Sequence, residues 1–182
     1  KKGEMPGAPM HPHRGFNEVP YCKILAHPNQ PNPSKGKTLV NRELRDTEMD
    51  EGDLEWGKAA HGIEHEFMID RNWTGEMHFF QMWVNLPQAH KMDAPEFQNA
   101  TSASLPKFMA LDEAISCKIL VGELEGRKSP VTCQNSEIMY FDFESPIKAD
   151  FTLPMALERR ILYCYSGRAQ CGGKEVFVHI SL

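Results

Sequence analysis

Three histidines have the residue type and spacing of a metal site. His11 and His13 are separated by one residue, and His65 stands much later in the chain. In an extended strand, residues i and i+2 point to the same face, so both imidazoles of the pair can face one ion. Neutral imidazoles bind Zn, Ni, Cu and Fe(II). The alternative for the pair alone is two surface histidines in an irregular N-terminal stretch; the third histidine favours a metal site.

Acidic residues also surround the third histidine. Glu64 and Glu66 flank His65, and Phe67 follows two residues after it. Adjacent residues of a strand point to opposite faces, so either glutamate reaches an ion on His65 only if a β-bulge shifts the register. Under that condition we assign Glu66 as a displaced fourth ligand, and otherwise both glutamates are solvated. Phe67 shares the face of His65 and places an apolar ring there.

Short segments with strand-like patterns recur along the chain and must position these histidines. They are residues 16–25, 38–44, 54–56, 61–68, 77–86, 116–121, 130–133, 137–143, 160–165 and 175–182. Many short strands separated by turn residues predict an all-β barrel or sandwich. The polar segment 88–107 interrupts the pattern and predicts a connector between two β-rich parts. We place the domains at residues 1–98 and 99–182.

Composition excludes several function classes. The 182 residues include 25 acidic and 20 basic side chains, and the net charge of −5 argues against direct nucleic-acid binding. The 41% hydrophobic fraction excludes wholesale disorder. No apolar run approaches the ~20 residues that span a bilayer. Five cysteines without a Cys-x-x-Cys pair argue against a disulfide framework and a thiolate zinc site. The sequence contains neither a phosphate-binding loop nor a Gly-x-Ser-x-Gly elbow, so we assign no catalytic residue and no organic cofactor site.

Several motifs resemble those of the pirin family, which belongs to the cupin superfamily. The most specific are His-Pro-His-Arg-Gly-Phe at 11–16 and Trp-Val-Asn-Leu-Pro at 83–87. Gly-Asp-Leu-Glu-Trp at 52–56 is similar to the family's Gly-Asp-Leu-Gln-Trp. Weaker similarities lie at 119–123, 140–143 and 163–167, so the resemblance extends from about residue 6 to residue 172.

The resemblance implies tandem cupin-like barrels of the double-stranded β-helix or jelly-roll type, a bicupin. It implies one iron-type metal in the first barrel, held by three histidines and one glutamate. Carried over, the histidines fall on His11, His13 and His65, whereas the glutamate position is Phe67. The family's glutamate after Arg-Gly-Phe is replaced by Asn17, with Glu18 one place late.

The departures from the family suggest a function without catalysis. Phe67 removes a carboxylate, and Pro20 removes a ladder donor inside an expected strand. The matched region is short at both ends, so we expect partly incomplete barrels whose open strand edges are covered by protein partners. The first hypothesis is therefore a pseudoenzyme with a degenerate metal site, a structural or interaction subunit of a larger assembly.

Two alternatives stay open. One is a metal-dependent, Fe-type dioxygenase resembling quercetin dioxygenases; the other is a binding module for transcription factors. No cofactor is assigned beyond Fe or another divalent transition metal. The family implies the cytoplasm or nucleus, and an organelle is open if an N-terminal targeting segment was removed.

Overall fold

The computed structural model describes most of the chain. The residues outside the description are 1–6, 27–33, 71, 112, 114, 146–147, 151, 153–158 and 178–182. The chain forms two compact units, Lys1–Asp150 and Phe151–Leu182. The domain division at residues 98 and 99 stays a prediction.

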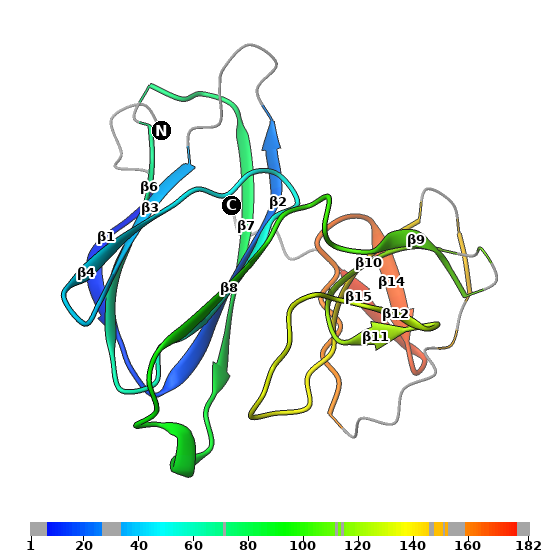
Figure 1. Cartoon of the computed structure of the whole chain (residues 1–182). Helices are drawn as coiled ribbons and strands as arrows, with labels where there is room; N and C mark the ends of the chain where they lie inside the picture. Colours follow the sequence, from blue (N-terminus) through cyan, green and yellow to red (C-terminus); the bar gives the residue numbers. More distant parts are fainter. Residues whose placement is uncertain are drawn as a thin grey trace. The chain divides into compact units, whose positions relative to one another are not determined.

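Two four-stranded antiparallel sheets form the N-terminal part and lie opposite each other (Figure 1). The first sheet has the order β1 (Gly7–His13), β6 (Ile63–Ile69), β3 (Ser34–Val40) and β4 (Glu43–Thr47). The second sheet has the order β7 (Glu76–Asn85), β2 (Phe16–Ala26), β5 (Leu54–Lys58) and β8 (Glu96–Ala100). A 3-10 helix, η1 (Gln88–His90), follows β7.

The remaining strands form a smaller sheet and two hairpins. The sheet has the order β13 (Tyr140–Glu144), β10 (Ile115–Val121) and β9 (Lys107–Ala110). The hairpins are β11 (Glu123–Leu124) with β12 (Arg127–Lys128), and, in the second unit, β14 (Arg168–Cys171) with β15 (Lys174–Phe177). The all-β prediction is confirmed. No helix among the described residues is long and apolar enough to cross a membrane.

Several predicted strand boundaries were wrong for identifiable reasons. Positive φ values at Asn41 (51°) and Arg42 (71°) make a turn that divides the strand expected at 38–44 between β3 and β4. No strand forms at 130–133, where the Gln98 side chain bonds both the N–H and the C=O of Thr132 in place of a ladder. Residues 160–165 are not a strand either, and Ile161 is 97% exposed.

Other boundaries differ because polar sequences still pair in sheets. The expected connector 88–107 contains β8, which is hydrogen-bonded to β5. The N-terminal stretch forms β1 from residue 7 onward. The strand expected at 175–182 corresponds to β15, and residues 178–182 lie outside the described part.

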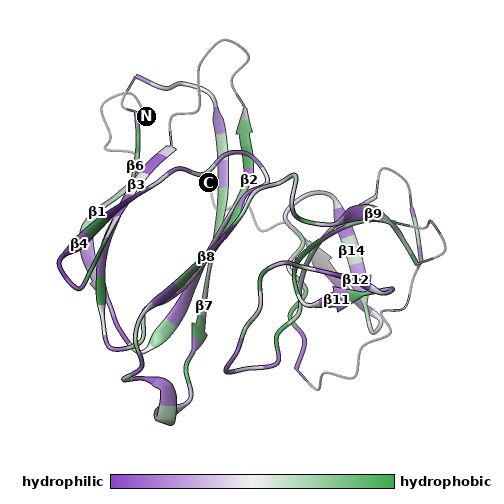
Figure 2. Ribbon diagram, viewed as in Figure 1, coloured by the Kyte–Doolittle hydropathy of each residue, from purple (hydrophilic) through white to green (hydrophobic). Residues whose placement is uncertain are grey.

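Strand β2 contributes to two different interiors because its side chains alternate. Val19 and Tyr21 pack into an apolar core with Leu54, Trp56 and Leu120, which links the second sheet to β10. Glu18 points to the opposite face, toward β1 and β6. Hydrophobic and hydrophilic residues are mixed along the strands in Figure 2. Glu18 and Val19 are both fully buried, so each face of β2 is covered.

Pro20 lies inside this central strand, as the sequence predicted. It pairs in register with Gln81 of β7. On the other side, the β2–β5 register includes Asn17, Glu18 and Tyr21 but no pair at Pro20. The missing N–H of proline therefore interrupts one ladder without ending the strand.

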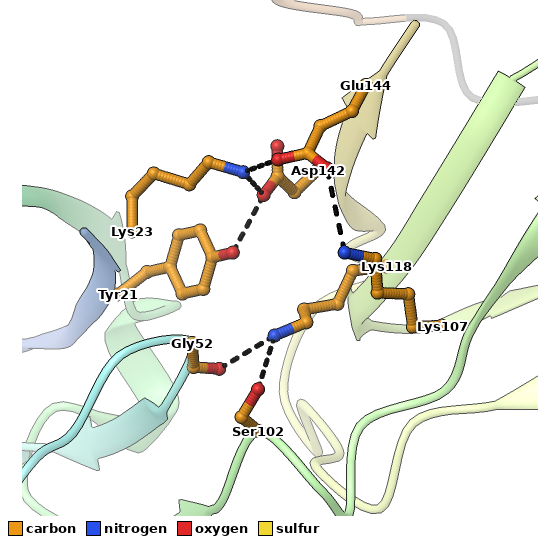
Figure 3. Close-up of polar contacts among 8 residues, drawn as sticks. All are labelled: Tyr21, Lys23, Gly52, Ser102, Lys107, Lys118, Asp142 and Glu144. Carbon is orange, nitrogen blue, oxygen red and sulfur yellow. Dashed lines mark hydrogen bonds and ion pairs between the residues drawn. The ribbon is translucent and has the colours of Figure 1, made fainter. Parts of the chain in front are cut away.

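A polar network joins β2 to β13 beside the apolar core (Figure 3). The Tyr21 hydroxyl donates to Asp142 Oδ2 at 2.7 Å, and Lys23 Nζ donates to the same oxygen at 2.6 Å. Lys23 also pairs with Glu144, and this hydrogen bond lowers the pKa of Glu144. Because Lys23 and Asp142 are both about nine-tenths buried, the pair fixes β13 against β2.

A second lysine of the network holds a turn. Lys118 Nζ of β10 donates to Ser102 Oγ at 2.8 Å and to the Gly52 carbonyl at 3.3 Å (Figure 3). Burial lowers the pKa of Lys118, and the nearby Lys107 adds to this effect. These contacts connect the turn before β5 to β10 and support the fold.

Candidate metal centre

The structure brings the three predicted histidines together on two paired strands. β1 and β6 are antiparallel neighbours, with His11 directly opposite His65. One donor atom from each of His11, His13 and His65 can be chosen so that all lie within 4.8 Å of one another. His11 Nε2 and His65 Nε2 are 3.0 Å apart. The i, i+2 geometry of β1 and its pairing with β6 therefore form the cluster.

A backbone carbonyl fixes the orientation of the first histidine. His11 Nδ1 lies 2.7 Å from the carbonyl oxygen of Pro9. Because a carbonyl only accepts, Nδ1 carries the proton and Nε2 presents its lone pair to the cluster. Metal-binding histidines are commonly oriented by such a second hydrogen bond.

Glu18 is the residue of this site that the sequence did not identify. Its side chain is fully buried, and Oε2 lies 2.8 Å from His13 Nδ1 and 3.2 Å from His65 Nε2. Neither carboxylate oxygen has a hydrogen bond of acceptable geometry within the described residues, and neither does His13 Nδ1. The alternation of β2 contained the signal, because apolar Val19 and Tyr21 face one core and leave Glu18 on the other face.

Burial sets the charges of this cluster. It raises the pKa of Glu18 to about 8, with a further contribution from the Glu55 carboxylate. It lowers the pKa of His65 to about 4, and the two other histidines contribute in the same direction. The pKa of His13 is also lowered, by burial and then by His11. A divalent ion binds neutral imidazoles, and it would supply the positive charge that a buried carboxylate lacks. Burial therefore leaves the cluster in charge states that favour binding of such an ion.

The structure keeps Glu66 away from the face of the histidines. The register of β6 with β3 is regular from Glu64 to Ile69, so Glu66 and His65 point to opposite faces. The irregularity lies between Ala8 and His11 in β1 instead. The bulge needed for Glu66 is thus absent from the β3–β6 pairing, and the described cluster consists of the three histidines.

Phe67 occupies the position where a carboxylate was expected. Its ring contacts the Phe79 ring of β7, with centroids 5.0 Å apart. An apolar ring therefore lies next to His65 on β6, and the carboxyl group of the site comes from β2.

An aromatic surface adjoins the cluster. Phe16 and Trp83 are stacked with centroids 4.8 Å apart. The imidazole of His13 lies 5.0 Å from the Phe16 ring and 5.4 Å from the Trp83 ring. Trp83 is 63% exposed, so one side of this stack faces solvent.

The donor set fits a divalent transition metal. Three neutral nitrogens and one carboxylate oxygen are the borderline ligands that Fe(II), Ni(II) or Zn(II) accept. The buried Glu18 carboxylate, which has no hydrogen bond, is the structural observation that supports this fit. The described residues therefore form a candidate site for a divalent transition metal.

Comparisons with known proteins find relatives with similar sequences. No family model matches it. A pirin-like protein from Caulobacter vibrioides is 32% identical over 166 residues, covering 90% of this chain and 56% of the relative. Pirin from Mus musculus is 31% identical over 157 residues, covering 85% of this chain and 49% of the relative. The chain spans about half the length of these curated relatives.

Solved structures agree with the sequence relatives. A quercetin 2,3-dioxygenase from Acinetobacter baumannii superposes with a TM-score of 0.62 and 26% identity, over 77% of this chain and 46% of the other. A second structure of that name gives a TM-score of 0.69 at 18% identity, which supports the fold. The predicted cupin-type, two-barrel fold class is confirmed. The curated relatives show that the chain is similar to members of the pirin family over 85–90% of its length.

Proposed function

We propose that this chain binds one divalent transition metal through His11, His13 and His65 and acts as a metal-dependent dioxygenase on an aromatic substrate. The single observation that supports it most is the convergence of three imidazoles beside a buried carboxylate that has no hydrogen bond. The substrate class is suggested by the quercetin dioxygenase among its structural neighbours. A bound metal would supply Lewis acidity and an open position for oxygen or substrate.

The chain's own residues supply orientation and binding. The Pro9 carbonyl holds the His11 proton on Nδ1, so Nε2 stays available as a ligand. The stacked rings of Phe16 and Trp83 present an apolar surface beside His13, suited to the face of an aromatic ring. Phe67 and Phe79 pack against each other and add an apolar contact on the His65 strand.

Metal content and oxygen consumption test this function. The full chain, loaded anaerobically with Fe(II) and desalted, should retain about one ion per chain, because three imidazoles converge. His65→Ala should lose the ion, whereas the matched variant His61→Ala, in the turn before β6, should keep it. Oxygen uptake with a flavonol should require both the metal and His65. A purified chain that retains no Fe, Ni or Zn under these conditions refutes the proposal.

A non-catalytic role in a protein assembly is the second candidate. The observation that favours it is Phe67, whose packing on Phe79 puts an apolar ring next to His65. Under this function, the chain would lack both metal and oxygen uptake, and size-exclusion chromatography would show it only in complex with other chains. The transcription-factor module stays a prediction without a supporting structural observation.

A further inference from the structure

The carboxylate of Glu18 is buried in a way that proteins rarely tolerate. It lies on the central strand β2 with an exposed fraction of 0%. Burying a carboxylate is costly unless it is paired and hydrogen-bonded. Its close neighbours, His13 Nδ1 and His65 Nε2, lie at 2.8 and 3.2 Å without hydrogen-bond geometry. The arrangement is explained if these atoms face a common partner rather than one another.

The distances match donors that share one ion. Metal–nitrogen and metal–oxygen bonds of ~2.1 Å at tetrahedral or octahedral angles place neighbouring donors about 3.0–3.4 Å apart. The Glu18–His13, Glu18–His65 and His11–His65 contacts measure 2.8, 3.2 and 3.0 Å. The His11–His65 contact also has the length of a hydrogen bond. The two Glu18 contacts, which lack hydrogen-bond geometry, have the spacing of a coordination sphere within a few tenths of an ångström.

Other carboxylates nearby do not have this placement. Glu64 and Glu66 point away from the face of His65. Burial raises the pKa of Glu55 of β5, and the nearby Arg45 guanidinium opposes this shift and so acts as its counter-charge. Phe67 on β6 offers no donor. Glu18 is thus the acid that contacts the histidines within the described residues.

We propose that Glu18 is the anionic ligand of the metal, supplied from β2 in the opposite sheet. This inference rests on the proposed metal binding at the three histidines. The ion would then lie between the two sheets. It would be bound by His11, His13 and His65 of one sheet and by Glu18 of the other. A single negative charge leaves a divalent ion with a net charge of +1, and an oxygen ligand favours Fe(II) and Mn(II) relative to a purely nitrogen site.

The test is metal affinity of the full chain, measured by competition with a chromophoric chelator, together with the visible spectrum of the Co(II) form. Glu18→Gln preserves the shape of the side chain and removes its charge. It should weaken metal affinity at least ~100-fold, because loss of a residue that only orients a ligand typically weakens affinity 10–100-fold. Glu18→Asp should retain part of the affinity. Glu55→Gln, the matched buried carboxylate, should bind like the native chain. Thermal melts and circular dichroism of each metal-free variant show whether it is folded.

The outcomes separate this inference from the function. If the native chain binds metal, His65→Ala loses it and Glu18→Gln binds as tightly with an unchanged Co(II) spectrum, the role of Glu18 is refuted and the three-histidine site stands. If the native chain binds no metal, the proposed function fails, and the role of Glu18 fails with it. If Glu18→Gln does not fold, Glu18→Asp decides: native affinity and an unchanged spectrum would refute the ligand role, whereas weakened affinity and a changed spectrum support it.

Discussion

The metal-free protein should become less stable as the pH rises from neutrality, and Glu18 should cause the change. Its pKa is about 8 in the folded state, because of burial and the nearby Glu55, against an ordinary value of 4.5. The folded state therefore holds a proton that the unfolded state releases. The contribution of Glu18 to stability is complete below pH 4.5 and is lost as the pH rises through 8.

The measurable window lies between pH 6.5 and 8. His65 has the opposite dependence: its folded pKa of about 4 lies below the ordinary 6.5, so its stabilising contribution is present above 6.5 and lost as the pH falls toward 4. Of these two residues, only Glu18 therefore changes the free energy of unfolding above pH 6.5. Over 1.5 pH units, at ~1.4 kcal/mol per unit, the free energy of unfolding should fall by about 2 kcal/mol.

Urea unfolding of the chelator-treated chain at pH 6.5 and pH 8 measures this difference. Glu18→Gln cannot ionise, so its free energy of unfolding should stay level where the native value declines. Saturating divalent metal should abolish the decline as well, because the bound ion keeps Glu18 ionised at both pH values. Equal declines in the native chain and in Glu18→Gln would show that another group titrates and that the pKa of Glu18 is not raised.

Three further perturbations test the surrounding structure. Asp142→Ala removes the acceptor of two buried donors and should cost about 3 kcal/mol of unfolding free energy in urea titrations; a loss below 1 kcal/mol would contradict a stabilising network. Gly52→Ala should cost about 2 kcal/mol in the same assay, because φ is +83° and a Cβ would collide with the Ser102 hydroxyl; an unchanged midpoint would refute this. Burial raises the pKa of Cys22 and of Cys117 to about 12, so neither thiol should react with Ellman's reagent at pH 8 until the chain unfolds, and rapid native labelling of either, located by mass spectrometry, would be the contrary result.

Sequence periodicity predicted an all-β chain, because strand alternation is a local property, whereas the tandem cupin-like barrels were implied by the resemblance to the pirin family. His11 and His13 needed only the i, i+2 rule, and the strand around His65 was visible in its pattern. Alternation with Val19 and Tyr21 indicates that Glu18 faces away from them, but which sheet covers that face of β2 is a tertiary property, so the role of Glu18 was missed. The position of the β1 irregularity, between Ala8 and His11, likewise depends on pairing with β6 and has no local signal.

The segment between the two halves was misjudged for a related reason. Residues 88–107 are polar and contain prolines, which locally indicates a connector. Pairing of β8 with β5 overrides this preference, because Ala100 joins the apolar core and backbone ladders tolerate polar side chains on the exposed face.

The two-faced strand β2 also determines which fragments of this chain can be handled in isolation. Its Val19 and Tyr21 face, together with Trp56, is covered by Leu120 and Val121 of β10. A fragment ending at residue 98 would expose this apolar face of β2 to water, and exposed apolar surfaces promote aggregation. Expression trials and crystallisation should therefore retain residues through Asp150, the end of the first compact unit. A cut between the expected barrels would pass through a shared interior instead of a linker.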